Sequence, residues 1–260
     1  MRIKSIITVL SIISLLVIPC VSGCILPVSG SGNLITEQFN YTDFDSIQIS
    51  NVFEVEISQS DTCSISVTAD DNIMDYVIVS RSGSNLLVRL EQGYNYQSIT
   101  AIAKISLPDI SELTMSGAAK GILKKFNTSR KVEIDVSGAS ELEIMDLTAG
   151  TVDIDVSGAS VVGGTIACGD AEFNISGAST MNVAGSGQDL TAEVSGASKL
   201  ELDNFTVNDV DIEVSGASNA VVNMDGTLNA EVSGASSLYY IGNPVMGDID
   251  ISGASSVRKK

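Results

Sequence analysis

The chain has 260 residues, of which 14 are basic and 32 acidic, so its formal net charge is −18. It contains no histidine, which removes the commonest general base and the commonest transition-metal ligand from any proposed site. The excess of acid also argues against nucleic acid as a partner, because phosphate binding depends on clusters of lysine and arginine.

Residues 1–23 have the pattern of a signal peptide. Arg2 and Lys4 form a basic start, and residues 6–18 form an apolar stretch that is too short for a comfortable membrane span. We therefore expect this leader to be removed. Its loss takes away two basic residues and no acid, which changes the net charge from −18 to −20.

The end of the leader matches a bacterial lipobox. Residues 21–24 read Val-Ser-Gly-Cys, in which small residues precede the cysteine that would be acylated. We expect lipid attachment at Cys24 and a tether rich in Pro, Gly and Ser over residues 24–33, which would hold the domain off the membrane. An ordinary signal peptide cleaved nearby is the alternative.

Residues 34–110 lack a regular motif but keep the alternation of apolar and polar residues that is typical of half-buried strands. We expect this region to form irregular first coils that cap the regular region and cover the end of its core. The expected strands are 46–49, 52–57, 64–67, 86–90 and 102–105.

Residues 111–257 contain an internal repeat. The tripeptide Ser-Gly-Ala begins at Ser116, Ser137, Ser157, Ser176, Ser195, Ser215, Ser233 and Ser252, and all copies after the first extend to Ser-Gly-Ala-Ser. A strand with period-two alternation precedes each copy, and the repeat length near 20 residues is that of one β-helix coil. The sequence therefore predicts an all-β fold: a single-stranded, right-handed parallel β-helix with an irregular N-terminal cap, continuous over residues 34–257.

Coils stacked about 4.8 Å apart bring equivalent residues into rows. The rows one and three residues before the motif serine are apolar, and we expect them to form the buried core. The first row contains Val136, Val156, Ile175, Val194, Val214, Val232 and Ile251, and the second contains Ile134, Ile154, Phe173, Ala192, Ile212, Ala230 and Ile249.

The repeated turn is interpreted as scaffold. We expect its glycines to supply a backbone angle or a close approach of coils that a side chain would hinder, its alanines to point inward at the corner, and its serines to hydrogen-bond along their rows. A catalytic serine is not indicated, because Gly-x-Ser-x-Gly is absent and no histidine is available. The turn glycines are Gly138, Gly158, Gly177, Gly196, Gly216, Gly234 and Gly253.

Several short motifs occur in an order that resembles one known family, the auto-transporter adhesin head domain, also called the GIN domain. They are Gly30–Asn33, Phe44–Ile47, Val55–Ile57, Ala69–Asn72, Leu107–Ile110 and Leu113–Ala118. The resemblance covers about residues 30–255. It implies a parallel β-helix in exported, often lipid-anchored proteins with a role in adhesion, and it supplies no active site to carry over.

Two outward rows of the strands before the motif are strongly acidic. They contain Glu133, Asp135, Asp153, Asp155, Glu172, Asn174, Thr191, Glu193, Asp211, Glu213, Asn229, Glu231, Asp248 and Asp250, of which eleven are acidic. Such a face could bind Ca²⁺ through carboxylate oxygens and bridge to an anionic polysaccharide. The candidate ligands are Asp135, Asp155, Glu193, Glu213, Glu231 and Asp250. The alternative is a solvated face that keeps the protein soluble, and no dedicated calcium-loop motif is present.

The sequence thus predicts a non-enzymatic surface lipoprotein, anchored at the cell surface or in the periplasm, with an adhesin-like or envelope-structural role. Its partners would be the membrane and an extracellular glycan or surface protein, and no cofactor is expected beyond possible Ca²⁺. The alternatives are a polysaccharide lyase or hydrolase that uses paired carboxylates, and a cation-dependent glycan-binding module. Cys63 and Cys168 are expected to remain isolated thiols.

Overall fold

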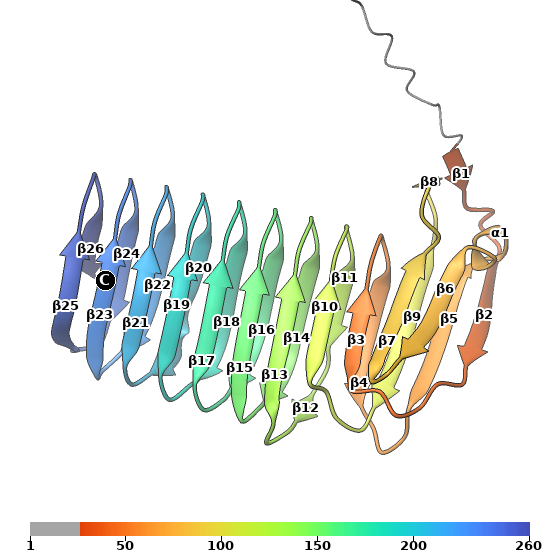
Figure 1. Ribbon diagram of the computed structural model, residues 1–260, viewed down its shortest axis with the longest axis horizontal. Helices are drawn as coiled ribbons and strands as arrows, with labels where there is room; N and C mark the ends of the chain where they lie inside the picture. Colours follow the sequence, from red (N-terminus) through yellow and green to blue (C-terminus); the bar gives the residue numbers. More distant parts are fainter. Residues whose placement is uncertain (1–26) are drawn as a thin grey trace, which may run out of the picture.

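Residues with period-two alternation form β-strands throughout residues 27–260, the part of the chain that the computed structural model describes. The expected leader and Cys24 lie outside these residues. Within the described part, the strands are joined by short turns and by one four-residue helix, α1 (Asp71–Met74). Successive coils stack side by side along one axis, with the N-terminal region at one end (Figure 1).

Each regular coil contributes one strand before the motif turn and one after it, and these strands build two sheets. In spatial order the first sheet contains β25 (Val245–Ile251), β23 (Thr227–Val232), β21 (Val210–Val214), β19 (Leu190–Val194), β17 (Ala171–Ile175), β15 (Thr151–Val156), β13 (Lys131–Val136), β10 (Glu112–Met115), β3 (Ser46–Ile49), β7 (Asn85–Leu90) and β6 (Val77–Ser82).

The second sheet lies behind the first and follows the same stacking. In spatial order it contains β26 (Ser256–Lys259), β24 (Ser237–Ile241), β22 (Asn219–Met224), β20 (Lys199–Val207), β18 (Thr180–Ser186), β16 (Val161–Ala167), β14 (Glu141–Thr148), β11 (Lys120–Leu123), β4 (Glu54–Gln59), β9 (Ala101–Leu107), β5 (Ser64–Asp70) and β2 (Leu34–Phe39), while β12 (Phe126–Asn127) pairs with β14. A separate two-stranded sheet joins β1 (Pro27–Ser29) to β8 (Asn95–Gln97).

Neighbouring strands of the regular region are parallel and in register from coil to coil. Val136 of β13 lies opposite Val156 of β15, which lies opposite Ile175 of β17. The same pairing continues through β25, so the repeat length of about 20 residues is one full coil and the solenoid has about seven turns. This confirms the predicted parallel β-helix.

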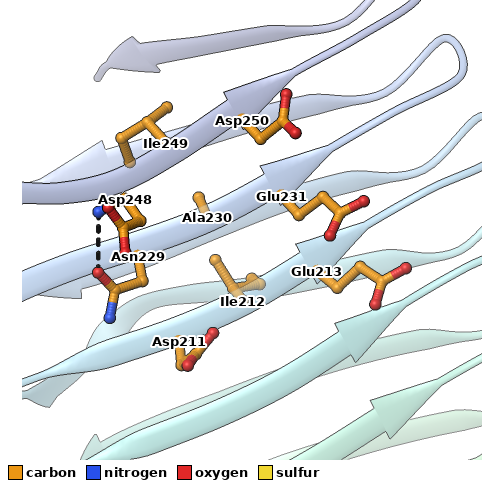
Figure 2. A pocket seen from close by; sticks show the side chains of 9 residues that line it. All are labelled: Asp211, Ile212, Glu213, Asn229, Ala230, Glu231, Asp248, Ile249 and Asp250. Atoms are coloured by element: carbon orange, nitrogen blue, oxygen red, sulfur yellow. Dashed lines mark hydrogen bonds between the residues drawn. The ribbon is translucent and has the colours of Figure 1, made fainter.

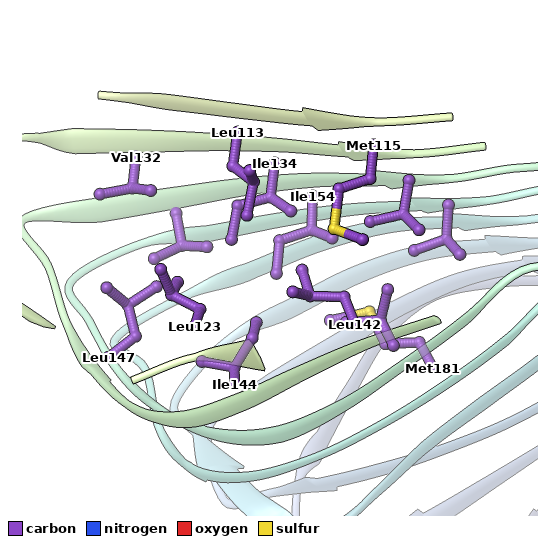
Figure 3. Packing of buried hydrophobic residues seen from close by; sticks show 14 of the residues in the cluster. Leu113, Met115, Leu123, Val132, Ile134, Leu142, Ile144, Leu147, Ile154 and Met181 are labelled. Carbon is purple, nitrogen blue, oxygen red and sulfur yellow. The ribbon is translucent and has the colours of Figure 1, made fainter. Parts of the chain in front are cut away.

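The core is the apolar layer between the two sheets. Ile134 and Ile154 of the first sheet face Leu142 and Ile144 of the second, and all four are at most 1% exposed (Figure 3). The two predicted apolar rows are therefore buried along the regular coils. Together with the facing row of the second sheet they form one continuous cluster that extends into the N-terminal region.

The last coil departs from this pattern. Ile251 is 47% exposed and Ile249 is only partly buried, although both were expected in the core. The reason is that β25 and β26 each have a neighbouring strand on one side only within the described residues. An apolar row is buried by the coils on both sides of it, so its terminal member stays half open.

The motif turn has a different interior from the one expected. The alanines, such as Ala139, are exposed, whereas the second serine of each full motif except the last is buried; Ser140 is 2% exposed and Ser160 is not exposed. The expectation of inward alanines is therefore wrong. After the glycine the chain turns so that the alanine side chain faces solvent and the next side chain enters the corner of the core.

Most of the buried serines accept a hydrogen bond along their row, as expected, although within residues 27–260 the hydroxyls of Ser140 and Ser198 have no partner. The backbone N–H of Ser160 donates to Oγ of Ser179 at 3.4 Å, and that of Ser218 donates to Oγ of Ser236 at 3.3 Å. A buried N–H without an acceptor is costly, so a serine suits this corner better than an alanine of similar size. Ala119 takes the equivalent place in the first motif, and Phe53 in the coil before it.

The motif glycines meet both of the conditions expected of them. Their φ angles lie between 72° and 78° in the seven full copies, a region that residues with a side chain rarely adopt. A Cβ on Gly196 would also lie 2.4 Å from the carbonyl oxygen of Gly177 in the preceding coil. The glycines therefore permit both the turn and the close stacking of turns.

The N-terminal cap contains antiparallel strands as well as coils. The five expected strands correspond to β3, β4, β5, β7 and β9, and β3 with β4 forms a coil against β10 and β11. Beyond the coil of β7 and β9, β6 runs antiparallel to β7, β5 antiparallel to β9, and β2 antiparallel to β5. These outer strands end the parallel stack, which would otherwise present a parallel edge for pairing with another chain.

Residues 27–33, which we name the strap, lie within the expected tether but are held against this cap. β1 pairs with β8, and the strap backbone N–H of Gly32 donates to Oδ1 of Asp70 at 2.7 Å. Oδ2 of Asp70 accepts from the N–H of Thr100, also at 2.7 Å. Asp70 is only 2% exposed. Its buried carboxylate therefore links the strap to the loop before β9 through these two hydrogen bonds.

Candidate functional site

The strands of the first sheet place the predicted carboxylates on one outer surface, which we name the acidic face. It comprises the fourteen outward residues of the two rows in β13 to β25. One row runs from Asp135 through Asp155, Asn174, Glu193, Glu213 and Glu231 to Asp250 by direct strand register. All six predicted cation ligands are therefore in this row, one per coil.

The opposite face of the solenoid is different in charge. Its outward rows on β14 to β26 contain Glu141, Glu143, Val161, Gly163, Thr180, Asn182, Lys199, Glu201, Asn219, Val221, Ser237, Tyr239, Ser256 and Arg258. Three of these fourteen residues are acidic and two are basic, against eleven acidic and no basic residues in the acidic face. Negative charge is thus concentrated on one side of the molecule.

The N-terminal half of the acidic face is partly neutralised. Nζ of Lys131 lies 2.7 Å from Oε1 of Glu133 and 3.1 Å from Oδ2 of Asp153. Asp135, in the neighbouring row, has no such partner. Partial burial raises the pKa of its carboxyl above the ordinary value, and the negative charge of Asp155 raises it further.

The C-terminal half has a shallow depression of about 460 Å³ on β21, β23 and β25. Glu213, Glu231 and Asp250 extend from successive strands along one side of it, as Figure 2 shows. On the other side, the backbone N–H of Asp248 donates to Oδ1 of Asn229 at 3.0 Å. With strands about 4.8 Å apart, the depression presents a row of evenly spaced carboxylates.

A closed cation cage is absent from residues 27–260, since no group of three or more Asp, Glu, Cys or His side chains there could hold a metal ion. Calcium prefers six to eight oxygen ligands, and a single row supplies one carboxylate per coil. Calcium binding by this row therefore stays a prediction. The arrangement suits an extended contact with a partner better than the enclosure of one ion.

Some acidic residues outside the acidic face have a structural role that the sequence did not reveal. In the turns between the second and first sheets, Oδ1 of Asp209 accepts from the backbone N–H of Thr227 at 2.6 Å, and Oδ1 of Asp189 accepts from the N–H of Asp209 at 3.2 Å. The recurrence of Asp one or two residues before a strand was the available signal. Part of the acidic excess thus orders these turns.

The two cysteines of the described region are free thiols, as expected, although each is half-buried. Burial raises the pKa of the Cys168 thiol to about 11, and nearby Asp170 contributes in the same direction. Since the thiolate is the nucleophilic form, Cys168 is a poor nucleophile at neutral pH. Within residues 27–260, no helix has the length and apolar character that spanning a bilayer would require.

Comparison with known families decides the classification. The family model described as "Putative auto-transporter adhesin, head GIN domain" matches residues 43–244, most of the chain. The chain belongs to this family. The matched range therefore includes most of the cap and all regular coils but the last, together with most of the acidic face.

Solved structures support the same fold for this GIN domain protein. A putative adhesin from Parabacteroides merdae has 22% sequence identity and a TM-score of 0.84, covering 90% of this chain and 99% of that one. A putative adhesin from Parabacteroides distasonis has 20% identity and a TM-score of 0.83, covering 90% and 100%. A protein of the latter organism described as a putative lipid binding protein has 18% identity and a TM-score of 0.79, with the same coverage. No curated protein matches the chain.

Proposed function

We propose that this GIN domain protein is a non-enzymatic, lipid-anchored surface protein that binds a partner through the acidic face. The proposal rests on the charge asymmetry of the solenoid, with eleven acidic residues among fourteen outward positions on one face and three on the other. Solubility alone would not require the charge to be on one side. The adhesin description of the family supports a binding role at the cell surface.

The partner is a glycan or a protein of the cell exterior that reaches the row of carboxylates. Like charges about 5 Å apart repel by roughly 1 kcal/mol per pair in water, and a partner that supplies positive charge relieves this repulsion. The positive charge comes from basic groups on the partner or from Ca²⁺ that bridges to an anionic polysaccharide. The competing role is envelope structure, with the acidic face solvated.

An array of glycans and extracellular-matrix proteins, probed with the mature protein with and without EDTA, tests the proposal. The informative variant replaces Glu213 and Glu231 with Gln, and the matched control replaces Glu141 and Glu201 on the opposite face. We expect the first variant to lose binding and the second to retain it. Equal binding by both variants would contradict a role for the acidic face, and EDTA sensitivity would identify a cation-bridged contact.

Calorimetric titration with Ca²⁺ separates direct from cation-bridged binding. Heat of binding together with a raised melting temperature is expected if the row takes up calcium; no heat and an unchanged melting temperature at millimolar calcium would remove that mode. Turnover of acidic glycans by the purified protein would overturn the non-enzymatic assignment. The lipid at Cys24 is tested by the intact mass of protein recovered from the membrane fraction, with Cys24→Ala as the control.

A further inference from the structure

The strap changes the length of chain available between the lipid and the fold. β1 begins at Pro27, so only Ile25 and Leu26 separate it from Cys24. Three Cα–Cα steps span at most about 11 Å when fully extended. A tether of ten residues, as expected from the sequence, could hold the domain well away from a membrane, but the remaining link cannot.

A tyrosine cluster lies beside this point. Tyr76, Tyr94 and Tyr96 pack against one another, with the ring centroids of Tyr76 and Tyr94 4.7 Å apart and those of Tyr76 and Tyr96 5.9 Å apart. Tyr96 is on β8, directly opposite Val28 of β1. The cluster holds three of the six tyrosines in a chain without tryptophan.

The cluster is held in place and partly open to solvent. The hydroxyl of Tyr96 donates to the backbone carbonyl of Glu91 at 2.8 Å, and the ring packs against the core. Tyr94 is 42% exposed. In Figure 1, β1 and β8 lie together at the N-terminal end of the solenoid, away from the regular coils.

We propose that this end of the molecule, formed by β1, β8 and the tyrosine cluster, rests on the headgroup layer of the membrane. The inference rests on the proposed lipid at Cys24. Headgroups extend about 5 to 8 Å on each side of the hydrocarbon core, so an anchor within about 11 Å of β1 places β8, one strand spacing farther, beside that layer. Tyrosine is enriched at this depth because its ring is apolar and its hydroxyl is polar.

The exposed carboxylates at this end determine which headgroup charge the surface can approach. Asp75 and Glu91 are exposed acids close in sequence to Tyr76 and Tyr94, and exposed Asp71 accepts a hydrogen bond from the strap residue Ser31. Carboxylates are repelled by the negative surface potential of anionic lipids. The surface therefore fits zwitterionic or uncharged headgroups.

Single-tryptophan fluorescence tests the inference, because the natural chain has none. The acylated full chain with Tyr94→Trp is reconstituted into phosphatidylcholine vesicles whose acyl chains are brominated close to the headgroup. The control is Tyr239→Trp on β24, eight strands along the second sheet from β9, which is about 38 Å at 4.8 Å per strand. We expect a blue shift and a severalfold loss of emission for the Tyr94→Trp indole and neither change for the control.

A third protein carries Tyr94→Trp and a Gly-Ser spacer of strap length between Leu26 and Pro27. It should float with vesicles as before but lose most of the quenching, because the longer link frees the domain. Unchanged quenching would overturn the short link as the cause of the contact.

Intact mass and flotation distinguish failure of the anchor from failure of the contact. Absence of the lipid and of flotation would overturn both the anchor and this inference. An acylated protein that floats but gives equal emission for Tyr94→Trp and Tyr239→Trp would overturn the contact alone. Circular dichroism confirms that each variant is folded.

Discussion

The turn residues carry two constraints that the strands do not. The motif glycine adopts a positive φ and approaches the carbonyl of the preceding coil, while the second serine is buried and supplies an acceptor for a neighbouring backbone N–H. Each constraint involves the coil before or after. Substitutions at these positions therefore act on the stacking of coils rather than on a single turn.

Gly196→Ala should lower stability more than Gly83→Ala. Both glycines have positive φ, 78° and 62°, but a Cβ at Gly83 meets nothing within 4 Å, whereas at Gly196 it lies 2.4 Å from a carbonyl oxygen. The angle alone costs about 1 to 2 kcal/mol, and overpacking adds about 1 to 3 kcal/mol. Urea unfolding of both variants measures the difference. Equal losses would mean that the backbone angle, and not the close stacking, requires the glycine.

At the level of the strands, the regular register aligns the acidic residues at alternate strand positions into a charged surface. Each strand of the first sheet contributes two outward residues, and parallel pairing aligns them with those of the next coil. Like charges then face each other wherever neighbouring coils both carry an acid, as from Glu193 to Asp250, which is a destabilising arrangement. Where Lys131 is present it offsets the repulsion between Glu133 and Asp153; the C-terminal rows have no lysine or arginine at the corresponding outward positions.

Asp135→Asn should stabilise the protein at neutral pH. Because burial and Asp155 raise the folded-state pKa of Asp135, the stability associated with its protonated form is present below the ordinary value of 3.8 and is lost as pH rises through the raised pKa. The gain at pH 7, below about 1 kcal/mol for a group this exposed, should therefore vanish in acid.

Urea midpoints as a function of pH measure this gain, and added salt should reduce it. Glu141→Gln is the control, since Glu141 lies 3.6 Å from Lys120 across exposed strands and its neutralisation relieves no repulsion between carboxylates. A pH-independent gain for Asp135→Asn would point to packing rather than charge.

The whole molecule is a stack with two unlike ends. At the C-terminal end of the described residues the last apolar row is half open, with Ile251 exposed, whereas at the other end antiparallel strands close the sheets. The strap crosses this closed end and is fixed there by Asp70. Asp70 shares this role with Asn72, whose side chain bonds Ser31 and Ser29 of the strap, and with the pairing of β1 and β8.

Asp70→Ala should loosen the strap at Gly32 while leaving the coils folded. The change removes two charge-assisted hydrogen bonds from backbone N–H groups to the buried carboxylate, each contributing roughly 1.5 to 3 kcal/mol. Amide hydrogen exchange at Gly32 and Thr100 should become faster, and exchange in β13 to β23 should not change. Asp71→Ala is the matched control, because Asp71 is exposed, its carboxylate accepts from the strap hydroxyl of Ser31, and its backbone hydrogen bond to Asn33 survives the substitution. Faster exchange throughout the coils would show that the hydrogen bonds of Asp70 stabilise all coils and not the strap alone.

Much of the solenoid could be predicted from the sequence because the same pattern of apolar, polar and turn residues recurs in each coil. Coil length follows from the spacing of Ser-Gly-Ala, the core from the apolar rows, and the acidic face from the alternate positions between them. These features depend on local alternation and on pairing between equivalent residues, so one register determines all coils. The candidate site could be placed in the same way, residue by residue.

Other features depended on contacts that have no period in the sequence. The corner admits the second serine and excludes the alanine because the glycine reverses the chain direction by an amount that only the folded turn defines. The antiparallel cap arises because the end of a stack lacks a neighbour, and the strap is ordered because Asp70 and β8, distant in sequence, meet it in space. The sequence by itself determined the coil, its core and its charged face; only the tertiary structure decided how the stack is closed and where it is tethered, because both depend on unique, nonrepeating contacts.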